Sequence, residues 1–455
     1  MALTTVILAA GQGKRMNSDL PKVLQPLAGR SILSHVLATA NALGSESINI
    51  VYGHGGDLVR KEFEASSVEW TLQAEQLGTG HALKQALPSI PKDHQVLILF
   101  GDVPLITEAS LKKLLREARD GGIALLTAEL SNPKGYGRVL RNGQNEVIAI
   151  VEEKDATSEQ RLVKEINTGL MVVPGKSIHD WIKALSDDNQ QGEFYLTDVI
   201  SIASAEGVPV VGVLVEHIEE IVGINDRVQL AEAERILQRR QAREVMVQGA
   251  TLADPERFDL RGSLKVGRDV FIDVGAIFLG DTQLGNRVRI GPNAVISNSV
   301  LGDDCIVREH CVMEGVVTGA ECEIGPFARL RPGTEFDKQV KVGNFVEVKA
   351  STVGVGSKMN HLSYVGDSHV GENTNIGAGT ITCNYDGASK HRTTIGDRVF
   401  IGSGAMLVAP LEIADDATIA AGSTITKNVP EQTLAVARSR QSLNKGWKRP
   451  KKPSR

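Results

Sequence analysis

The feature that most constrains the fold is a six-residue repeat of aliphatic residues in the second half of the chain. A period of six fits neither an amphipathic helix nor a simple alternating strand. It predicts a solenoid in which each hexad is one short, flat strand whose aliphatic side chain stacks inward. In many hexads a glycine follows directly, which permits the turn to the next face. The repeat positions are Val266, Ile272, Phe278, Leu284, Ile290 and Ile296; Val300, Ile306, Val312, Thr318, Ile324, Leu330, Phe336, Val342 and Val348; Val353, Met359 and Val365; Val370 and Ile376; and Ile395, Ile401, Leu407, Ile413, Ile419 and Ile425.

This array resembles the hexapeptide-repeat family, whose fold is a left-handed parallel β-helix. The composition agrees with tight turns and small cores, since 46 of 455 residues are glycine and only 4% are aromatic. Two stretches depart from a uniform array: an insertion at 383–394 and a basic tail at 445–455. Solenoids leave their flanks exposed, and the resemblance implies that a homotrimer buries them.

The first half of the chain has a different organisation, in which strand-like apolar runs alternate with helical patterns. The runs lie at 6–10, 48–52, 96–100, 123–126, 147–151 and 210–215. Such alternation predicts an α/β domain with βαβ units and a mostly parallel sheet. The segment 227–248 lacks glycine and proline and is rich in Ala, Glu, Arg and Gln, so it predicts a long linker helix that ends at Gly249. We therefore expect an α/β domain at 1–226, a linker helix at 227–248 and a β-helix domain at 249–455.

Charge and cysteine content narrow the classes of function. The 50 Lys and Arg residues against 55 Asp and Glu residues give a net charge of −5, which argues against nucleic-acid binding by bulk positive charge. Four cysteines without a C-x-x-C pair do not predict a zinc site or a disulfide framework, and we expect reduced thiols. The short apolar run at 6–10 is too short to cross a membrane. We expect a cytoplasmic protein that acts on small molecules, without membrane insertion.

A glycine-rich turn at 11–16 follows the first predicted strand. Met16 stands where a dinucleotide-binding loop needs its third glycine, and the spacing also excludes a Walker A loop. The remaining pattern, L-x-x-G-x-G-x-x-M followed by Leu-Pro-Lys22, resembles the signature of sugar-nucleotide pyrophosphorylases. Lys14 departs from it, since the family usually has threonine there. Loop amides can cradle a triphosphate, and Lys22 adds positive charge where pyrophosphate leaves.

Further segments support this resemblance, which implies a uridyltransferase with a Rossmann-like fold that uses UTP and Mg²⁺. Gln73 would bind the uracil edge, Asp102 and Asn225 would bind Mg²⁺, and Glu152 and Asn167 would bind the sugar. The sugar phosphate attacks the α-phosphorus directly, so no covalent nucleophile or general base is expected. The residues implied to contact UTP or the nucleotide sugar are Leu8, Ala9, Ala10, Gly11, Lys22, Gln73, Gly78, Thr79, Phe100, Gly101, Asp102, Gly137, Glu152, Asn167 and Asn225.

The solenoid carries polar clusters that a scaffold does not require. With them, the whole chain resembles the bacterial bifunctional enzymes that acetylate glucosamine 1-phosphate and then couple the product to UTP for envelope synthesis. The resemblance implies that His361 is the base that deprotonates the sugar amine, for which a pKa of about 6.5 is suitable. It assigns glucosamine-1-phosphate binding to Arg331, Lys349, Tyr364 and Asn375, and acetyl-CoA binding to Ala378, Asn384, Tyr385, Ser403, Ala421 and Arg438. The basic tail could also screen coenzyme A phosphates.

Two other interpretations remain open at this point. In the first, only the uridyltransferase is active and the β-helix serves oligomerisation or regulation, as in ADP-glucose pyrophosphorylases. In the second, the chain is not an enzyme, like the translation-initiation exchange-factor subunits that pair similar domains. The first is disfavoured by the cluster of Arg331, Lys349, His361 and Tyr364 together with the insertion at 383–394. The second is disfavoured by an intact glycine loop together with Lys22, Asp102 and Asn225.

Overall fold

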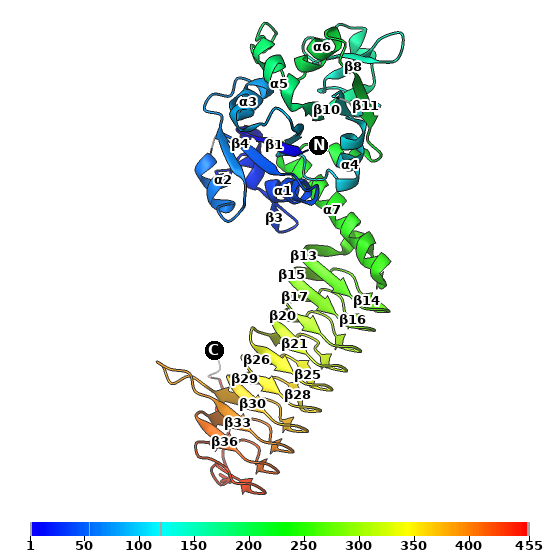
Figure 1. Cartoon of the computed structure of the whole chain (residues 1–455). Coiled ribbons are helices and arrows are strands. Elements are labelled where there is room, and N and C mark those ends of the chain that lie inside the picture. The colour runs from blue at the N-terminus through cyan, green and yellow to red at the C-terminus, as the bar shows by residue number, and fades with distance from the viewer. Residues whose placement is uncertain (1, 54, 119–120, 453–455) are drawn as a thin grey trace. The chain divides into compact units, whose positions relative to one another are not determined.

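The computed structural model describes residues 2–53, 55–118 and 121–452, and the chain divides into two compact units, Met1–Leu237 and Gln238–Arg455 (Figure 1). The division falls inside helix α7 (Arg227–Gln248), which covers the residues predicted for a long helix. Gly249, at φ +122°, follows its last residue and adopts a backbone conformation that favours glycine. None of the helices in the described ranges is long and apolar enough to span a bilayer.

The first unit is built on a nine-stranded sheet whose main order is β11-β7-β10-β6-β1-β4-β5. All six apolar runs predicted as strands lie in this sheet. The strands are β1 (Leu3–Ala9), β4 (Ser47–Tyr52), β5 (Glu69–Leu72), β6 (Gln95–Phe100), β7 (Ile123–Glu129), β8 (Arg138–Arg141), β9 (Val147–Val151), β10 (Glu165–Pro174) and β11 (Val210–Leu214). A small hairpin pairs β2 (Pro26–Leu27) with β3 (Arg30–Ser31).

The sheet is mixed rather than mostly parallel. Strand β10, which was not among the predicted runs, pairs antiparallel with both β6 and β7, and β8 pairs antiparallel with β9 and β10. The pairs β1–β4, β1–β6, β4–β5 and β7–β11 are parallel. The register of β10 against β7 shifts between Asn167 and Met171, and Gly169 at φ +83° lies in this irregular stretch. A bulge of this kind bends the strand locally.

Helices cover both faces of the sheet. Since successive strand residues point to opposite faces, the apolar residues of one strand pack into two separate cores. In β1, Ile7 packs into one apolar core and Val6 into the other, and in β6 Leu99 and Ile98 divide in the same way. The helices are α1 (Ile32–Ala42), α2 (Gly56–Glu62), α3 (Thr79–Ala86), α4 (Glu108–Glu117), α5 (Gly175–Trp181) and α6 (Asp198–Ala205). The 3₁₀ turns are η1 (Lys14–Met16), η2 (Lys22–Leu24), η3 (Leu87–Ser89), η4 (Gln160–Leu162), η5 (Ile182–Ala184) and η6 (Ile218–Ile221).

The second unit is a parallel β-helix in which short strands stack in three columns, with η7 (Pro255–Arg257) near its start (Figure 1). The first column contains β12 (Ala250–Leu252), β14 (Val270–Ile272), β16 (Arg289–Ile290), β19 (Ile306–Val307), β22 (Glu323–Ile324), β25 (Lys341–Asn344), β28 (Lys358–His361), β31 (Asn375–Ile376), β34 (Phe400–Ile401), β37 (Thr418–Ile419) and β39 (Leu434–Ala435). The second contains β17 (Val295–Ser297), β20 (Val312–Glu314), β23 (Arg329–Leu330), β26 (Glu347–Lys349), β29 (Tyr364–Gly366), β32 (Ile381–Cys383), β35 (Met406–Val408) and β38 (Thr424–Ile425). The third contains β18 (Val300–Leu301), β21 (Val316–Thr318), β24 (Thr334–Phe336), β27 (Thr352–Val353), β30 (Ser368–Val370), β33 (Thr393–Ile395) and β36 (Leu411–Ile413). The long strands β13 (Asp259–Val266) and β15 (Ile277–Leu284) start the second and third columns together, since β15 pairs with both β17 and β18.

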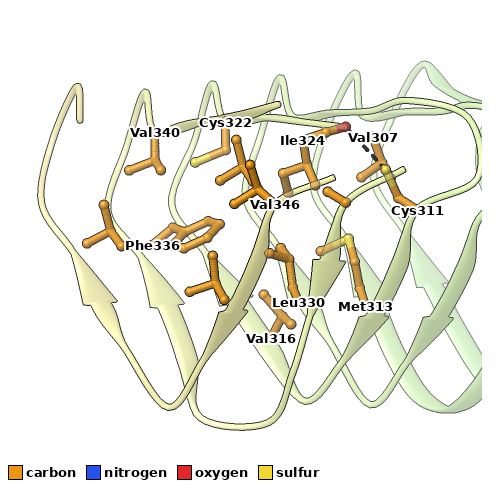
Figure 2. Close-up of a cluster of buried hydrophobic side chains, with 14 of the residues drawn as sticks. Val307, Cys311, Met313, Val316, Cys322, Ile324, Leu330, Phe336, Val340 and Val346 are labelled. Atoms are coloured by element: carbon orange, nitrogen blue, oxygen red, sulfur yellow. Dashed lines mark hydrogen bonds between the residues drawn. The ribbon is translucent and has the colours of Figure 1, made fainter. Parts of the chain in front are cut away.

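The interior of the β-helix is one continuous apolar core, in which equivalent residues of successive coils lie beside each other. Figure 2 shows Leu330 next to Met313 and Cys322 next to Val340 in such rows. Thr318 is the polar member of the repeat, and it is tolerated because its Oγ1 lies 3.4 Å from Cys305 Sγ and accepts a hydrogen bond from Gly302 N. All four cysteines are free.

The predicted repeat is wrong by one residue over part of the array. Val300 and Val312 are 41% and 44% exposed and Ile306 is only half-buried, whereas their neighbours Leu301, Val307 and Met313 are at most 2% exposed. In each pair both positions are apolar, so the sequence pattern does not distinguish them. Strand pairing does, because moving the register by one residue turns every side chain to the other face.

Candidate active sites

The first candidate site lies beyond the carboxyl ends of β1 and β6 and is centred on Lys22. Its Nζ lies 2.5 Å from Asp102 Oδ2 and donates to Asn225 Oδ1 at 3.1 Å. These three predicted residues come from η2, from the turn after β6 and from the segment before α7. The Lys22 side chain is 10% exposed and that of Asp102 is 21% exposed, so the ion pair is largely shielded from water. The structure therefore brings together three polar groups that lie 80 and 203 residues apart in sequence.

A cavity of about 220 Å³ lies on one side of this ion pair. Most of the predicted nucleotide residues line it, namely Leu8, Ala10, Gly11, Lys22, Gln73, Gly78, Thr79, Phe100 and Asp102. Gln76, Glu193, Val23 and Ala82 also line it and were not predicted as site residues, although Gln76 lies between the predicted Gln73 and Gly78 in the sequence. Within the described ranges, the amides of Gly11, Gln12 and Gly13 donate to no protein acceptor, as a phosphate-binding loop requires. Gly78, at φ +104°, leaves no room for a Cβ, which would lie 2.6 Å from the Phe194 carbonyl oxygen.

A second cavity lies against the same wall, since Phe100 and Asp102 line both. Asn225 and the bulge residue Thr168 line it, together with Arg15 and Lys134, whose positive charges suit an anionic ligand. The loop around Gly135 is held by Glu153, which accepts from Gly135 N and from the buried Arg138. Tyr136, Gly223, Gln229, Val103, Ile221 and Gly135 complete the lining. Of the lining residues, Phe100, Asp102 and Asn225 were predicted as site residues, and Gly135, Tyr136 and Thr168 lie next to the predicted Gly137 and Asn167 in the sequence.

Gly137, Glu152 and Asn167 form a group of their own and line neither cavity. Asn167 N donates to Gly137 O at 2.9 Å, and a Cβ on Gly137 would lie 3.3 Å from the Glu152 carboxylate oxygens. Burial raises the pKa of Glu152, and nearby carboxylates raise it further, while a hydrogen bond from Thr197 Oγ1 opposes the change. The group can therefore accept and donate hydrogen bonds to a polar, uncharged ligand.

Ala9 and Gly101 also lie outside the linings of the two cavities, but their close contact holds β1 and the turn after β6 together. A Cβ on Gly101 would lie 2.9 Å from the Cβ of Ala9, so β1 and the turn after β6 approach closely only because residue 101 is glycine. The backbone follows the same pairing, with Gly101 N donating to Leu8 O at 2.9 Å.

The second candidate site lies on the β-helix, around the second column of strands. Lys349 Nζ lies 3.6 Å from Asp367 Oδ2, and Asn384 Nδ2 donates to the same carboxylate and, at 3.3 Å, to Tyr364 Oη. Arg331 Nη1 donates to Glu347 Oε1 at 2.9 Å, one coil away in the same column. The structure thus links the predicted residues Lys349, Tyr364 and Asn384 through Asp367, which was not predicted.

Lys390 belongs to this cluster and was also missed. The contact between the two amines lowers the pKa of Lys390 and raises that of Lys349, because a neutral Lys390 amine can accept a hydrogen bond from a charged Lys349. Arg331 disfavours the charged form of both amines, while Asp367 favours it. A surplus of positive charge at one place attracts an anion. Lys390 lies in the insertion at 383–394, where no repeat pattern guides the interpretation.

His361, the predicted base, is exposed at the end of β28. Its Nδ1 lies 2.8 Å from Asn344 Oδ1 on the neighbouring strand β25, with which it is in register. Because an amide oxygen only accepts hydrogen bonds, Nδ1 carries the proton and Nε2 keeps its lone pair. The imidazole is therefore oriented to accept a proton through Nε2. Asn344 was not predicted.

Most of the residues predicted to bind acetyl-CoA lie at one corner of successive coils. Gly404 N donates to Ala378 O at 2.7 Å, Gly422 N to Ser403 O at 2.8 Å, and Arg438 Nη1 to Ala421 O at 2.7 Å. Tyr385 is 61% exposed in the insertion, and its Oη donates to Gly387 O. Asn375 lies in β31, in register with Lys358 rather than with His361.

A metal at the first site would need ligands from its substrate. Within the described ranges no group of three or more His, Cys, Asp or Glu residues could hold a metal ion. Asp102 and Asn225 offer one carboxylate and one amide oxygen, and both already face the Lys22 ammonium. These are hard oxygen donors that attract a cation, and they fit Mg²⁺ if phosphate oxygens and water complete its shell.

Comparison with known proteins gives the same division of the chain. Residues 5–193 match the model of the MobA-like NTP transferase domain, and residues 263–298, 281–315 and 392–427 match that of the bacterial transferase hexapeptide. Proteins named "Bifunctional protein GlmU" are similar over the whole chain. That of Marinobacter nauticus is 54% identical over 450 residues, which is 99% of both chains. The protein of Alkalilimnicola ehrlichii is 54% identical over 99% of this chain and 97% of its own length. The protein of Acinetobacter baumannii (strain ACICU) is 52% identical over 99% of both chains.

Proposed function

Since the chain belongs to the family of the bifunctional GlmU proteins, we propose that each unit carries one of its two reactions on the residues described above. The chain is a bifunctional transferase, with a uridyltransferase and an acetyltransferase activity. The β-helix unit transfers acetyl from acetyl-CoA to the amine of glucosamine 1-phosphate. The N-terminal unit then joins the product, N-acetylglucosamine 1-phosphate, to UMP from UTP and releases pyrophosphate.

In the uridyltransferase, a phosphate oxygen of the sugar forms the new bond to the α-phosphorus, and the bond from that phosphorus to the pyrophosphate oxygen breaks. Positioning and charge neutralisation account for such a reaction. UTP would occupy the cavity lined by Gly11, Gln73 and Lys22, with the loop amides on its phosphates. The sugar phosphate would enter beside Arg15 and Lys134, across the wall formed by Phe100 and Asp102.

Glu152 and Asn167 would bind the sugar hydroxyls and the N-acetyl group. The two oxygens that face Lys22, on Asp102 and Asn225, would hold Mg²⁺. When bound, Mg²⁺ supplies positive charge that neutralises the phosphates. Lys22 then turns from these two side chains to the phosphates of the substrate.

In the acetyltransferase, His361 Nε2 would accept a proton from the sugar amine. The amine nitrogen then forms a bond to the thioester carbonyl carbon, and the carbon–sulfur bond breaks to release coenzyme A. Arg331 and Lys349, with Lys390, would bind the sugar phosphate, while Tyr364 and Asn375 hold the sugar. Ala378, Asn384, Tyr385, Ser403, Ala421 and Arg438 would line the acetyl-CoA groove.

The acetyltransferase site is open on a single chain, which supports a homotrimer. His361 is exposed, and a row of exposed apolar residues runs along one corner of the coils, where Phe327 stacks on Phe345 with ring centroids 5.4 Å apart. Phe345 and Leu362 are 57% and 60% exposed, and a second copy of the chain would bury them. We further propose functional domains at 1–226 and 249–455 joined by the helix at 227–248, and a cytoplasmic location.

The uridyltransferase proposal rests mainly on one observation. Lys22 contacts Asp102 and Asn225 on the wall between two cavities. A paired assay tests it. One reaction contains glucosamine 1-phosphate and acetyl-CoA, and free thiol is measured. The other contains N-acetylglucosamine 1-phosphate, UTP and Mg²⁺, and pyrophosphate is measured.

Four variants accompany the natural chain in this assay. Asp102→Ala should abolish pyrophosphate release alone, and His361→Ala should abolish thiol release alone. Asp188→Ala, on the surface of the first unit, and His369→Ala, an exposed histidine of strand β30 that also bonds a neighbouring side chain, should leave both reactions unchanged. If the natural chain released only pyrophosphate, the β-helix would be a scaffold and the role of His361 would be wrong.

A further inference from the structure

His81, which was not predicted as a site residue, lies behind the residue proposed to bind the uracil edge. Gln73 follows β5 and is 3% exposed. Its Nε2 lies 3.1 Å from the carbonyl oxygen of Gly78 and 3.2 Å from Nδ1 of His81, in the first turn of α3. One turn further along α3, Nε2 of Gln85 lies 2.9 Å from Nε2 of His81. The three side chains form a chain of contacts that ends at the wall of the nucleotide cavity.

The backbone decides which way this chain of hydrogen bonds runs. The Gly78 carbonyl oxygen can only accept, so the nitrogen of the Gln73 amide must face it. The same nitrogen faces His81 Nδ1, which must therefore accept the second amide hydrogen and carry no proton. The proton of the neutral imidazole then lies on Nε2. Because the side-chain nitrogen of Gln85 faces this atom, the Gln85 amide has to turn over and offer its oxygen to accept the proton.

This arrangement uses both hydrogens of the Gln73 amide. Within the described ranges, no side chain or backbone amide donates to its Oε1. The side chain therefore presents an acceptor to a base in the cavity. The N3–H of uracil can donate to such an acceptor, whereas N3 of cytosine carries a lone pair and would leave two acceptors opposed.

We propose that His81, supported by Gln85, is a positioning residue that fixes the Gln73 amide with its oxygen toward the base, and so favours UTP over CTP. This inference rests on the proposed uridyltransferase function. Without the acceptor at His81 Nδ1, the Gln73 amide can turn over and present its nitrogen, which suits cytosine better. A histidine that only filled space against Phe194, whose ring centroid lies 6.4 Å away, would not affect this choice.

The experiment measures kcat and KM for UTP and for CTP in the complete chain, with N-acetylglucosamine 1-phosphate and Mg²⁺. His81→Leu removes the acceptor, and His81→Asn restores one, because Asn Oδ1 lies close to where Nδ1 was. Gln85→Leu removes only the support of the ring. His217→Leu, an exposed histidine of the same unit, is the matched control.

For His81→Leu, we expect the ratio of kcat/KM for UTP to that for CTP to fall about tenfold, the effect of one hydrogen bond. KM for UTP should rise while kcat changes little, because the lost interaction is made equally in the ground state and the transition state. His81→Asn should recover the natural ratio, Gln85→Leu should lower it about threefold, and His217→Leu should leave it unchanged.

An unchanged ratio in His81→Leu, or no recovery in His81→Asn, would overturn the inference. If His81→Leu lost all activity, Gln85→Leu would decide, since an unchanged ratio there contradicts the orientation of the ring. A natural chain that releases no pyrophosphate from UTP would instead overturn the proposed function on which the inference rests.

Discussion

Single residues set the electrostatics of both sites through neighbours that are far away in sequence. Burial raises the pKa of Glu152, whereas the hydrogen bond from Arg138 lowers that of its neighbour Glu153. Two adjacent carboxylates thus differ in their tendency to ionise. His361 likewise depends on Asn344, 17 residues earlier, for the orientation of its ring. The surroundings of each side chain thus set its behaviour: burial for Glu152, Arg138 for Glu153 and Asn344 for His361.

The raised pKa of Glu152 predicts a pH-dependent stability. A folded-state pKa above its ordinary value of 4.5 means that the native state holds the proton more tightly, so the stability falls as the pH rises through the window between the two values. Glu152→Gln should therefore raise the unfolding temperature of the first unit at about pH 7.5, and by less at about pH 4.5. Glu153→Gln should lower it at about pH 7.5, since the lowered pKa of Glu153 stabilises the native state above its ordinary range. Equal effects of Glu152→Gln at both pH values would contradict this prediction.

The contact of His361 with Asn344 predicts a loss of acetyl transfer without a loss of binding. In Asn344→Leu, Nδ1 has no acceptor, so the ring is free to turn and to carry its proton on Nε2. We expect kcat for acetyl transfer to fall about 10-fold to 100-fold, with little change in KM for glucosamine 1-phosphate. Asn344→Asp keeps an acceptor and should retain more activity than Asn344→Leu. The measurement is release of free thiol, with pyrophosphate release as the internal control.

At the scale of elements, strand pairing determines which of two neighbouring apolar residues becomes core. Strands β20 and β23 pair Met313 with Leu330, and this places Met313 inside and Val312 outside (Figure 2). In the first unit, β10 has a comparable irregularity, since its register against β7 shifts between Asn167 and Met171.

The register predicts unequal effects of truncating these two neighbours. Met313 is fully buried, so Met313→Ala should destabilise the β-helix unit by about 2 to 5 kcal/mol through lost burial and a residual cavity. Val312→Ala, at an exposed position, should change the free energy of unfolding by about 0.5 kcal/mol or less. Denaturant unfolding followed by circular dichroism measures both. A larger effect at Val312 than at Met313 would contradict the register.

At the scale of the whole molecule, the chain joins two units with separate cores through one helix. The division between units falls at Leu237 and Gln238, inside α7 rather than at either end of it. The first half of the helix packs into a core of the first unit through Ala233, and the second half packs on the β-helix through Ala242 and Val245. The helix is therefore structural in both units.

If the chain forms a homotrimer, disrupting the trimer should affect the two activities differently. The solution mass, measured by light scattering after gel filtration, should be three times that of one chain. Replacing the exposed aromatic residues in Phe327→Glu/Phe345→Glu should lower this mass and reduce acetyl transfer, because charges oppose burial of the corner. Pyrophosphate release should persist, since the cavities of the first unit are formed within residues 1–237. A monomer with full acetyltransferase activity would refute the homotrimer.

The β-helix, the long helix and the α/β unit could be predicted from the sequence, because the period of the apolar residues and the absence of glycine and proline act locally. The sequence motifs also indicated the residues around Lys22 and Asp102. The folded chain was needed to establish the strand register at Val312 and Met313, the antiparallel insertion of β10 and the partners Asp367 and Asn344. These depend on which strands lie side by side, and contacts between residues far apart in the chain leave no periodic trace in the sequence.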